Sequence, residues 1–242
     1  KYFQEVIEKV PHLKESAIEK LINVYNSQAN VYLTSGDFEK AEKYLKILVE
    51  KYGIKECYYN LAVINRKKGN IEKYKEYILK GIEFGDSECM FSYALFIYSE
   101  TGKYTEKVDM YLKKSAEIGN VDAMYELGLF ASEQNRIEDS KKWYKKAAEK
   151  GETTAMNNLA NIYSDEGNKE EAMELYLKSA EKGNPLAFFN LGNYYEENNN
   201  IELAKEYYGK VLDSLKGYPT CKIEQEALEK LKRLQNNSEL RK

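Results

Sequence analysis

The sequence predicts an all-α solenoid of stacked antiparallel helix hairpins. Closely similar phrases recur at a fixed period, as in KKAAEKGETTAMNNLANIYSDEGN from Lys145 and KSAEKGNPLAFFNLGNYYEENNN from Lys178. Each repeat contains a second break about fifteen residues after the first, as expected for two helices joined by a tight turn. Only three prolines occur in 242 residues, which suits long helices with short connections. A period of this size is typical of helical repeats whose hairpins bury their apolar faces against their neighbours.

The composition excludes several classes of protein. A chain of 242 residues with 43% hydrophobic residues is long and apolar enough to fold around a core, unlike a disordered chain. Its formal net charge of −3 argues against a nucleic-acid partner held by a strong basic field. No apolar run reaches the length of a transmembrane helix, so we expect no direct insertion of this segment into a membrane.

Glycines mark the ends of the predicted repeats. They are Gly53, Gly85, Gly119, Gly151, Gly183 and Gly217, with gaps of 32 or 34 residues. A glycine can close a helix in the left-handed conformation without a Cβ clash, and the residues that follow four of them can start the next helix. Those residues are Asp86, Asn120, Glu152 and Asn184. The predicted units are therefore 16–53, 54–85, 86–119, 120–151, 152–183 and 184–217.

Each unit reads as helix A, a tight turn and helix B. In the fifth unit, helix A places Ala155, Met156, Leu159, Ala160, Ile162 and Tyr163 on one apolar face. Helix B repeats this pattern with Ala172, Leu175, Tyr176 and Ala180. A leucine next to a small residue recurs at one position of helix A, as in Leu159–Ala160 and Leu191–Gly192. Such a pair indicates that two helices approach each other closely there.

The flanking segments complete the predicted organisation. Residues 1–11 read as the second helix of an incomplete repeat, residues 12–217 as six hairpins, and residues 218–242 as a capping helix and tail. The capping helix carries an apolar stripe formed by Ile223, Ala227, Leu228, Leu231 and Leu234. Because the chain begins at KYFQEVIEKV without a methionine, we expect a trimmed or processed chain. Its compartment stays open: the cytoplasm, or the periplasm if a leader preceded Lys1.

Two repeat families share these features. The pattern A-x-x-x-L-[GA]-x-x-Y, followed by A-x-x-x-[YL], resembles tetratricopeptide repeats and is matched by Ala187, Leu191, Gly192, Tyr195, Ala204 and Tyr208. The phrases KKWYKKAAEKG and LKSAEKGNPLAFFNLGNYY also resemble Sel1-like repeats. Either resemblance implies a right-handed superhelix with a concave groove lined mainly by helix A. Members of both families mostly bind proteins or peptides, so the resemblance implies that function here.

One predicted groove row lies two residues before the signature leucine, or before Tyr93 in the third unit. It consists of Tyr59, Phe91, Tyr125, Asn157 and Phe189. Aromatic side chains in a groove suit anchors for a partner, because they bury a large area at a small entropic cost. The alternative is that these rings pack against helix A of the next repeat and only complete the core.

A second set of candidates is asparagine. Asn60, Asn158 and Asn190 precede the signature leucine, and Asn161 and Asn193 follow the small residue. An amide both donates and accepts, so a ladder of amides can read an extended peptide backbone. The resemblance also implies a possible clamp for a terminal carboxylate, but Asn157 and Phe189 stand where its lysines would be. A solvated or helix-capping role for the asparagines is the other alternative.

No catalytic constellation is visible. His12 is the only histidine and has no evident ligand or nucleophile partner, and Cys57 and Cys89 read as small buried residues. Trp143 suits packing on helix B better than ligand stacking. We therefore predict a scaffold that is not an enzyme, needs no cofactor or metal, and binds a protein or an extended peptide. The alternatives are a structural or oligomeric subunit that associates through its convex face or ends, and a regulator or fragment of a larger enzyme.

Overall fold

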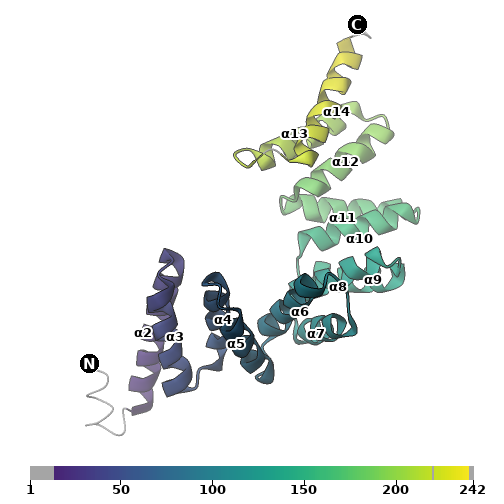
Figure 1. The fold of residues 1–242 in the computed structure, drawn as a ribbon. Coiled ribbons are helices and arrows are strands. Elements are labelled where there is room, and N and C mark those ends of the chain that lie inside the picture. The colour runs from purple at the N-terminus through teal and green to yellow at the C-terminus, as the bar shows by residue number, and fades with distance from the viewer. Residues whose placement is uncertain (1–13, 220, 240–242) are drawn as a thin grey trace. The chain divides into compact units, whose positions relative to one another are not determined.

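The computed structural model describes residues 14–219 and 221–239, and all regular elements in these ranges are helical. The prediction of an all-α chain is therefore confirmed for this part of the chain (Figure 1). The elements are α2 (Lys14–Ser35), α3 (Phe38–Tyr52), the 3-10 turn η2 (Lys55–Cys57), α4 (Tyr58–Lys67), α5 (Ile71–Glu83), α6 (Ser87–Thr101), α7 (Glu106–Ile118), α8 (Val121–Glu133), α9 (Ile137–Glu149), α10 (Thr153–Asp165), α11 (Lys169–Glu181), α12 (Pro185–Glu197), α13 (Ile201–Leu215) and α14 (Lys222–Glu239).

Consecutive helices pair into antiparallel hairpins, α2 with α3, α4 with α5, and so on to α12 with α13. The chain divides into two compact units, residues 1–120 and 121–242. In the first unit, α3 packs on α4 and α5 packs on α6; in the second, α9 packs on α10 and α11 packs on α12. Each unit is thus a stack of hairpins in which the second helix of one hairpin contacts the first helix of the next. The predicted helix of residues 1–11 lies outside the described residues.

Glycine closes the turns between hairpins in the second unit. Gly183 has φ 83° and follows α11, and the N–H of Asn184 donates to the carbonyl of Ser179 at 3.2 Å. This bond satisfies a carbonyl that the end of the helix would otherwise leave unpaired. The side chain of Asn184 then accepts from the N–H of Leu186 at 2.9 Å and caps α12. One short sequence, Gly-Asn, thereby ends one helix and starts the next.

In two hairpins, a glycine of helix A leaves space for a side chain of helix B. A Cβ atom on Gly192 would lie 2.5 Å from a ring carbon of Tyr208, and one on Gly128 would lie 2.5 Å from the ring of Tyr144. Both tyrosines belong to helix B and are buried. The small residue after the signature leucine therefore makes room for a tyrosine ring of the facing helix. Gly81 of α5 marks a close approach between hairpins instead, because an added Cβ would meet the Sγ atom of Cys89 on α6, the first helix of the next hairpin.

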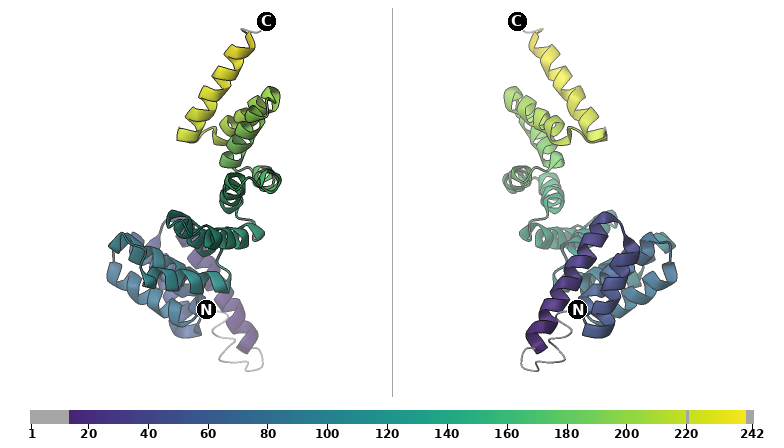
Figure 2. Two further views of the ribbon diagram at one scale, coloured as in Figure 1. Left: turned by 90° about the vertical axis from the view of Figure 1, so that its right-hand side faces the viewer. Right: turned by 90° about the vertical axis from the view of Figure 1, so that its left-hand side faces the viewer.

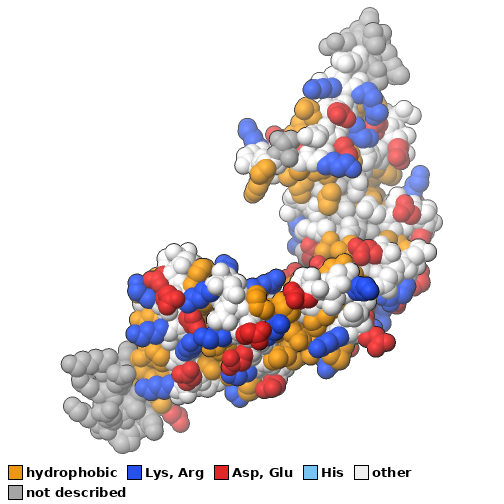
Figure 3. All heavy atoms as spheres, in the orientation of Figure 1, with side chains coloured by type: hydrophobic (Ala, Val, Ile, Leu, Met, Phe, Trp, Pro, Cys, Tyr) orange, Lys and Arg blue, Asp and Glu red, His pale blue; other side chains and the backbone are white. Residues whose placement is uncertain are grey.

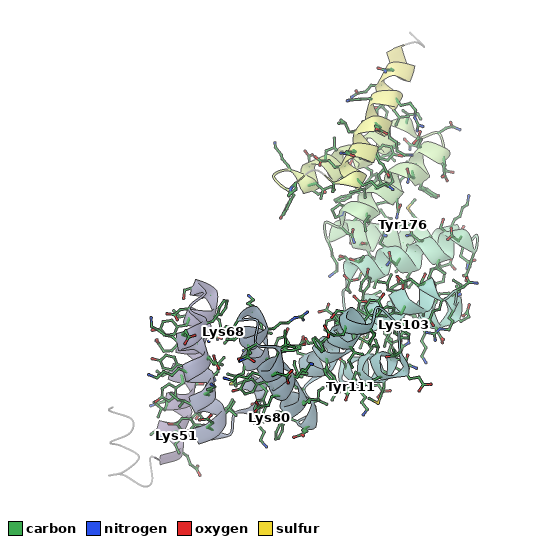
Figure 4. All side chains as sticks on the ribbon, viewed as in Figure 1. Lys51, Lys68, Lys80, Lys103, Tyr111 and Tyr176 are labelled. Atoms are coloured by element: carbon green, nitrogen blue, oxygen red, sulfur yellow. The ribbon has the colours of Figure 1, made fainter. Side chains whose placement is uncertain are left out.

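Ion pairs join neighbouring hairpins in the first unit. Lys68, just beyond α4, contacts the Glu42 carboxylate of α3 at 2.7 Å and the Glu39 carboxylate at 3.0 Å (Figure 4). Lys46 holds Glu42 from the other side at 2.9 Å. Burial alone would raise the pKa of Glu42, but the hydrogen bonds from Lys68 and Lys46 outweigh it and hold the pKa at about 2.

Helix α14 covers the end of the last hairpin, as Figure 1 and the two turned views of Figure 2 show in yellow. Ala227 and Leu234 are buried and share a core cluster with Tyr208 and Val211 of α13. Four of the five predicted stripe residues lie in this cluster, but Leu228 does not, because its side chain is 41% exposed. Leu228 was wrongly assigned to the packed face; it lies at the border of the stripe and faces solvent.

Candidate functional site: the A-helix face

The predicted contact residues fall in both units. Tyr59 and Asn60 are half-buried on α4, and Phe91 is half-buried on α6. Tyr59 packs against the core cluster that contains Tyr74 and Phe96. No hydrogen bond within the described residues ties Asn60 to another amide. The first unit therefore brings together no amide ladder.

The second unit does bring its predicted residues together. We call the set Tyr125, Asn157, Asn158, Phe189, Asn161, Asn190 and Asn193 the A-helix face, because its members lie on the first helices α8, α10 and α12. The amide nitrogen of Asn190 donates to Oδ1 of Asn157 at 2.9 Å and to Oδ1 of Asn161 at 3.0 Å. These bonds connect α12 to α10, so they fix the spacing of two successive hairpins as well as the orientation of three side chains.

Tyrosines of the second helices fix the remaining amides. The hydroxyl of Tyr176, labelled in Figure 4, donates to Oδ1 of Asn161 at 2.6 Å. The hydroxyl of Tyr208 donates to Oδ1 of Asn193 at 2.8 Å, in the equivalent place one hairpin later. Asn158 donates to the hydroxyl of Tyr144 at 3.3 Å. Burial raises the pKa of Tyr176 and of Tyr144 to about 12, so these hydroxyls keep their protons at any ordinary pH.

This arrangement leaves a defined set of unused polar atoms. The Oδ1 atoms of Asn161 and Asn193 are occupied, whereas no described residue bonds to the Nδ2 groups of these two side chains. Asn190 has used both hydrogens of its amide and keeps Oδ1 as an acceptor. All three side chains are half-buried and therefore reachable from one side. The face thus offers donors at Asn161 and Asn193, with an acceptor at Asn190 on the same helix as the second donor.

Asn157 has a different place from its neighbours. Its residue is only 2% exposed, and its Oδ1 atom accepts from Asn190. A side chain this deeply buried cannot contact a partner directly. Asn157 instead orients Asn190, and the predicted contact row contributes only its aromatic members in this unit.

The aromatic members pack on the same tyrosines that hold the amides. The ring of Tyr125 lies 6.0 Å from that of Tyr144, and the ring of Phe189 lies 5.7 Å from that of Tyr208. Both rings stay half-buried. Their inner edges therefore rest on helix B of their own hairpin, and Tyr125 also interacts with Asn158 on helix A of the next repeat.

A charged cluster closes the α14 end of the face. The Tyr208 hydroxyl shares its single proton between Oδ1 of Asn193 at 2.8 Å and the Glu196 carboxylate at 2.9 Å, and Glu196 also pairs with Lys230 at 3.3 Å and with Arg233. Burial would raise the pKa of Glu196, but the Tyr208 hydroxyl and these two cations lower it below its usual value. The ammonium of Lys230 also lies 5.8 Å from the Phe189 ring centroid. Helix α14 therefore covers one side of Phe189.

The sequence analysis placed Tyr176 and Tyr208 in the repeat pattern but missed their hydrogen bonds to the amides, and it missed the cluster around Glu196. The tyrosines had a signal, because each follows its asparagine by 15 residues in successive repeats. The cluster had none, since it depends on how α14 turns back onto α12.

The described residues contain no group of three His, Cys, Asp or Glu side chains placed to hold a metal ion. None of their helices is both long and apolar enough to cross a bilayer. Cys57 and Cys89 are buried free thiols, and burial raises the pKa of Cys57 to about 11. Charges of both signs are interspersed on the face of the molecule drawn in Figure 3.

Sequence comparison identifies the repeats. Tetratricopeptide repeat models match residues 26–73, 121–149, 153–182 and 186–214, which together span more than half of the chain. No curated protein matches the chain in sequence.

Solved structures agree on the fold. A Sel1 repeat protein from Oxalobacter formigenes superposes with a TM-score of 0.68 at 19% identity, over 86% of this chain and 99% of that one. PilF from Pseudomonas aeruginosa gives a TM-score of 0.63 at 15% identity, over 90% and 98% of the two chains. A protective antigen of uropathogenic Escherichia coli with an SLR fold gives 0.64 at 24% identity, over 81% and 47%.

The chain therefore belongs to the tetratricopeptide repeat proteins, and its fold is similar to that of Sel1-like repeat proteins. Its fold class is the all-α solenoid of helix hairpins, as predicted. Repeats of this kind typically serve as scaffolds for protein interactions and are generally not catalytic.

Proposed function

We propose that this chain is a non-catalytic scaffold that binds an extended segment of a partner protein on the A-helix face. The observation that carries the proposal is the pre-oriented set of amides on α10 and α12. Because internal bonds fix Asn161, Asn190 and Asn193, their free donors and acceptor need no reordering on binding, which lowers the entropic cost of association.

The spacing of the free donors fits an extended peptide. Asn161 and Asn193 occupy equivalent places on helices of neighbouring hairpins, and packed helices lie about 10 Å apart. An extended chain advances about 3.3 Å per residue, so two donors would meet carbonyls roughly three residues apart. The half-buried rings of Tyr125 and Phe189 flank the amides and supply apolar contact area.

The test replaces the free donors and keeps an acceptor oxygen for each internal bond. Asn161→Asp with Asn193→Asp keeps an oxygen for Tyr176, Tyr208 and Asn190 but exchanges each free NH2 for a carboxylate oxygen. Peptides selected by the wild-type protein from a random display library should lose at least about tenfold in affinity for this variant, since two hydrogen bonds become repulsive contacts. Removing the rings would be a weaker test, because they also pack on Tyr144 and Tyr208.

The matched control is Asn70→Asp with Asn200→Asp. Both residues cap helices through their side-chain oxygen, and aspartate caps equally well, so the charge changes by the same amount away from the face. This control should bind the selected peptides like the wild type. Equal affinity of all three proteins would refute the proposed surface.

One observation favours the alternative of an assembly subunit. Val24 and Val31 are 45% and 54% exposed and lie seven residues apart, on one side of α2. Exposed aliphatic side chains in this arrangement are typical of helix–helix contacts between chains. A concentration-dependent oligomer in sedimentation that disappears in Val24→Asp with Val31→Asp would support this function; a monomer at all concentrations would exclude it.

A further inference from the structure

The second helices carry an aromatic residue at one equivalent position in all hairpins but one. This position lies just before the central buried residue of helix B. An aromatic residue occupies it in five of the six hairpins, whereas the fifth hairpin along the chain has leucine. In chain order these residues are Tyr44, Tyr77, Tyr111, Trp143, Leu175 and Tyr207. Most of these rings pack on an aromatic ring of helix A in their own hairpin; Tyr111, for example, meets Tyr93 edge to face with the ring centroids 5.1 Å apart.

The last hairpin shows how an aromatic residue at this position, Tyr207, packs. The ring of Tyr207 lies parallel to that of Tyr195, with centroids 5.5 Å apart, and 6.5 Å from the centroid of Phe188. The ammonium of Lys210 lies 4.6 Å from its centroid. Ala180 and Leu191 complete the surrounding core cluster. The ring is thus enclosed by apolar side chains and covered by a cation.

The fifth hairpin has a pocket at this place. Its apolar lining is Ala148, Met156, Leu159, Tyr163 and Leu175, and its volume is about 280 Å³. Each of these residues precedes its counterpart around Tyr207 by 32 positions. Two replacements open the pocket: Leu175 stands for Tyr207 and Met156 for Phe188. Cavities of about 150 Å³ already accept a benzene ring, so this pocket has room for an aromatic side chain.

The tyrosine and the lysine that surround Tyr207 in the last hairpin have counterparts of the same residue type at the pocket. Tyr163 lines the pocket at the position equivalent to Tyr195; no other described ring stacks on it, and the Lys141 ammonium lies 5.7 Å from its centroid. Lys178 occupies the place of Lys210 and pairs with Glu174 at 2.5 Å, as Lys210 pairs with Glu206 at 2.6 Å. The Lys178 side chain is 56% exposed and therefore free to move over a guest.

The rim of the pocket favours a basic neighbour of the guest. Glu149 and Glu171 lie at the rim, and no ion pair within the described ranges engages either carboxylate. Lys145 and the Lys178–Glu174 pair complete the rim. Two unpaired carboxylates beside an apolar pocket complement a lysine or arginine that flanks an aromatic residue.

We propose that this pocket binds a tyrosine or phenylalanine side chain of a partner polypeptide, next to a lysine or arginine. The guest ring takes the place that Tyr207 fills in the following hairpin, stacks on Tyr163 and lies under Lys178. The flanking cation meets Glu149 and Glu171. The pocket is a second contact site that does not depend on the A-helix face.

The two sites lie on opposite sides of α10. Asn157, Asn158 and Asn161 project from one side, whereas Met156, Leu159 and Tyr163 project from the other, as the helical period of 3.6 residues requires. A partner held at one site therefore leaves the other open, and variants can test the two separately.

The experiment uses the full chain with labelled methyl groups. The peptide acetyl-Gly-Lys-Tyr-Gly-amide is titrated while the methyl signals of Ala148, Met156, Leu159 and Leu175 are followed by NMR. These signals should shift together and saturate. The Tyr→Ser peptide should bind at least about tenfold more weakly, since it loses the buried ring. A Lys→Glu peptide should bind about threefold more weakly, as expected for contacts with exposed carboxylates.

Leu175→Tyr is the matched variant. The new tyrosine fills the pocket with the kind of ring that the other hairpins already have at this position. The variant should therefore fold normally, and the peptide should no longer shift the signals of Ala148, Met156 and Leu159. Asn161→Asp with Asn193→Asp should leave the titration unchanged. The proposal is overturned if the serine peptide binds as well as the tyrosine peptide, if Leu175→Tyr still binds, or if no methyl signal responds.

A second copy of the chain is the competing occupant. Tyr218 is 71% exposed and has Lys216 and Lys222 nearby in the sequence, so it carries the same chemistry. Without peptide, the methyl signals of the pocket should not depend on protein concentration. If they do, and Tyr218→Ser removes that dependence, the pocket is a self-association site and the assignment to a separate partner is wrong.

Discussion

At the scale of single residues, close contacts between tyrosine rings and small residues organise the hairpins. Gly192 and Gly128 leave space for the rings of Tyr208 and Tyr144. The hydroxyl of Tyr208 donates a hydrogen bond to Asn193 on the facing helix of the same hairpin. One tyrosine therefore both fills the core and orients an amide on the A-helix face, so stability and binding are coupled through the same side chain.

Gly192→Ala should destabilise the protein although alanine is the better helix former. The added Cβ would lie 2.5 Å from the Tyr208 ring, and overpacking of this kind costs about 1–3 kcal/mol. Gly209→Ala is the control, because it lies in α13 with no atom within 4 Å of the added Cβ. That change should stabilise by up to about 1 kcal/mol. Urea denaturation of both variants measures the difference, and the same sign for both would contradict the packing described.

Sequence reasoning reached the residues that repeat but not the contacts they make. The amides at Asn161 and Asn193 were predictable as candidates because they recur at one position. Their bonds to Tyr176 and Tyr208 were not, since a hydrogen bond depends on the distance between two helices. Asn157 shows the same limit: its position matched the aromatic row, yet it is 2% exposed.

At the scale of elements, neighbouring hairpins are joined by polar contacts as well as by apolar packing. Lys68 reaches Glu42 of the preceding hairpin, and Lys141 of α9 reaches Glu166 beyond α10 at 2.9 Å. In the first pair the lysine belongs to the later hairpin, and in the second pair it belongs to the earlier one. The hairpins themselves were predictable from glycine spacing and apolar periodicity. The extent of the packed face of α14 was not predictable, because Leu228 continues the apolar pattern of the sequence but faces solvent.

Glu42→Gln tests the joint between the first two hairpins. The folded protein lowers the pKa of Glu42 from 4.5 to about 2, so its ionised form contributes stability above pH 4.5 that is lost as the pH falls towards 2. At pH 7 the variant should be less stable by about 2 kcal/mol. Denaturation curves between pH 7 and 2 should show this difference shrinking below pH 4.5.

Glu39→Gln is the control for that series. Its carboxylate also contacts Lys68, but the side chain is 88% exposed, so its loss should change stability little at any pH. A difference between Glu42→Gln and wild type that stays constant down to pH 2 would show that the carboxylate is not held as described.

At the scale of the whole molecule, the chain consists of two compact units, each of which contains core clusters of its own. The clusters around Leu45 and Tyr74 lie in residues 1–120, and those around Tyr176 and Tyr208 lie in residues 121–242. Repeat proteins owe their stability to each repeat and its nearest neighbours, so a stack of hairpins with its own core can fold alone.

The fragment of residues 121–242 should therefore fold without the first unit. It contains three hairpins, the helix α14 that covers the last of them, and every residue of the A-helix face. Circular dichroism should show a helical fragment that unfolds cooperatively in urea. A fragment that is unfolded or melts without a transition would mean that its stability depends on the first unit.

We propose above that the amides of the A-helix face bind an extended peptide. The most direct test follows the side-chain NH2 signals of Asn161 and Asn193 by NMR while a peptide selected by the wild-type protein is added. Both signals should shift and saturate together, with those of Asn70 and Asn200 unchanged. If the Asn161 and Asn193 signals stay in place while other residues respond, the partner binds elsewhere and the account of this face is wrong.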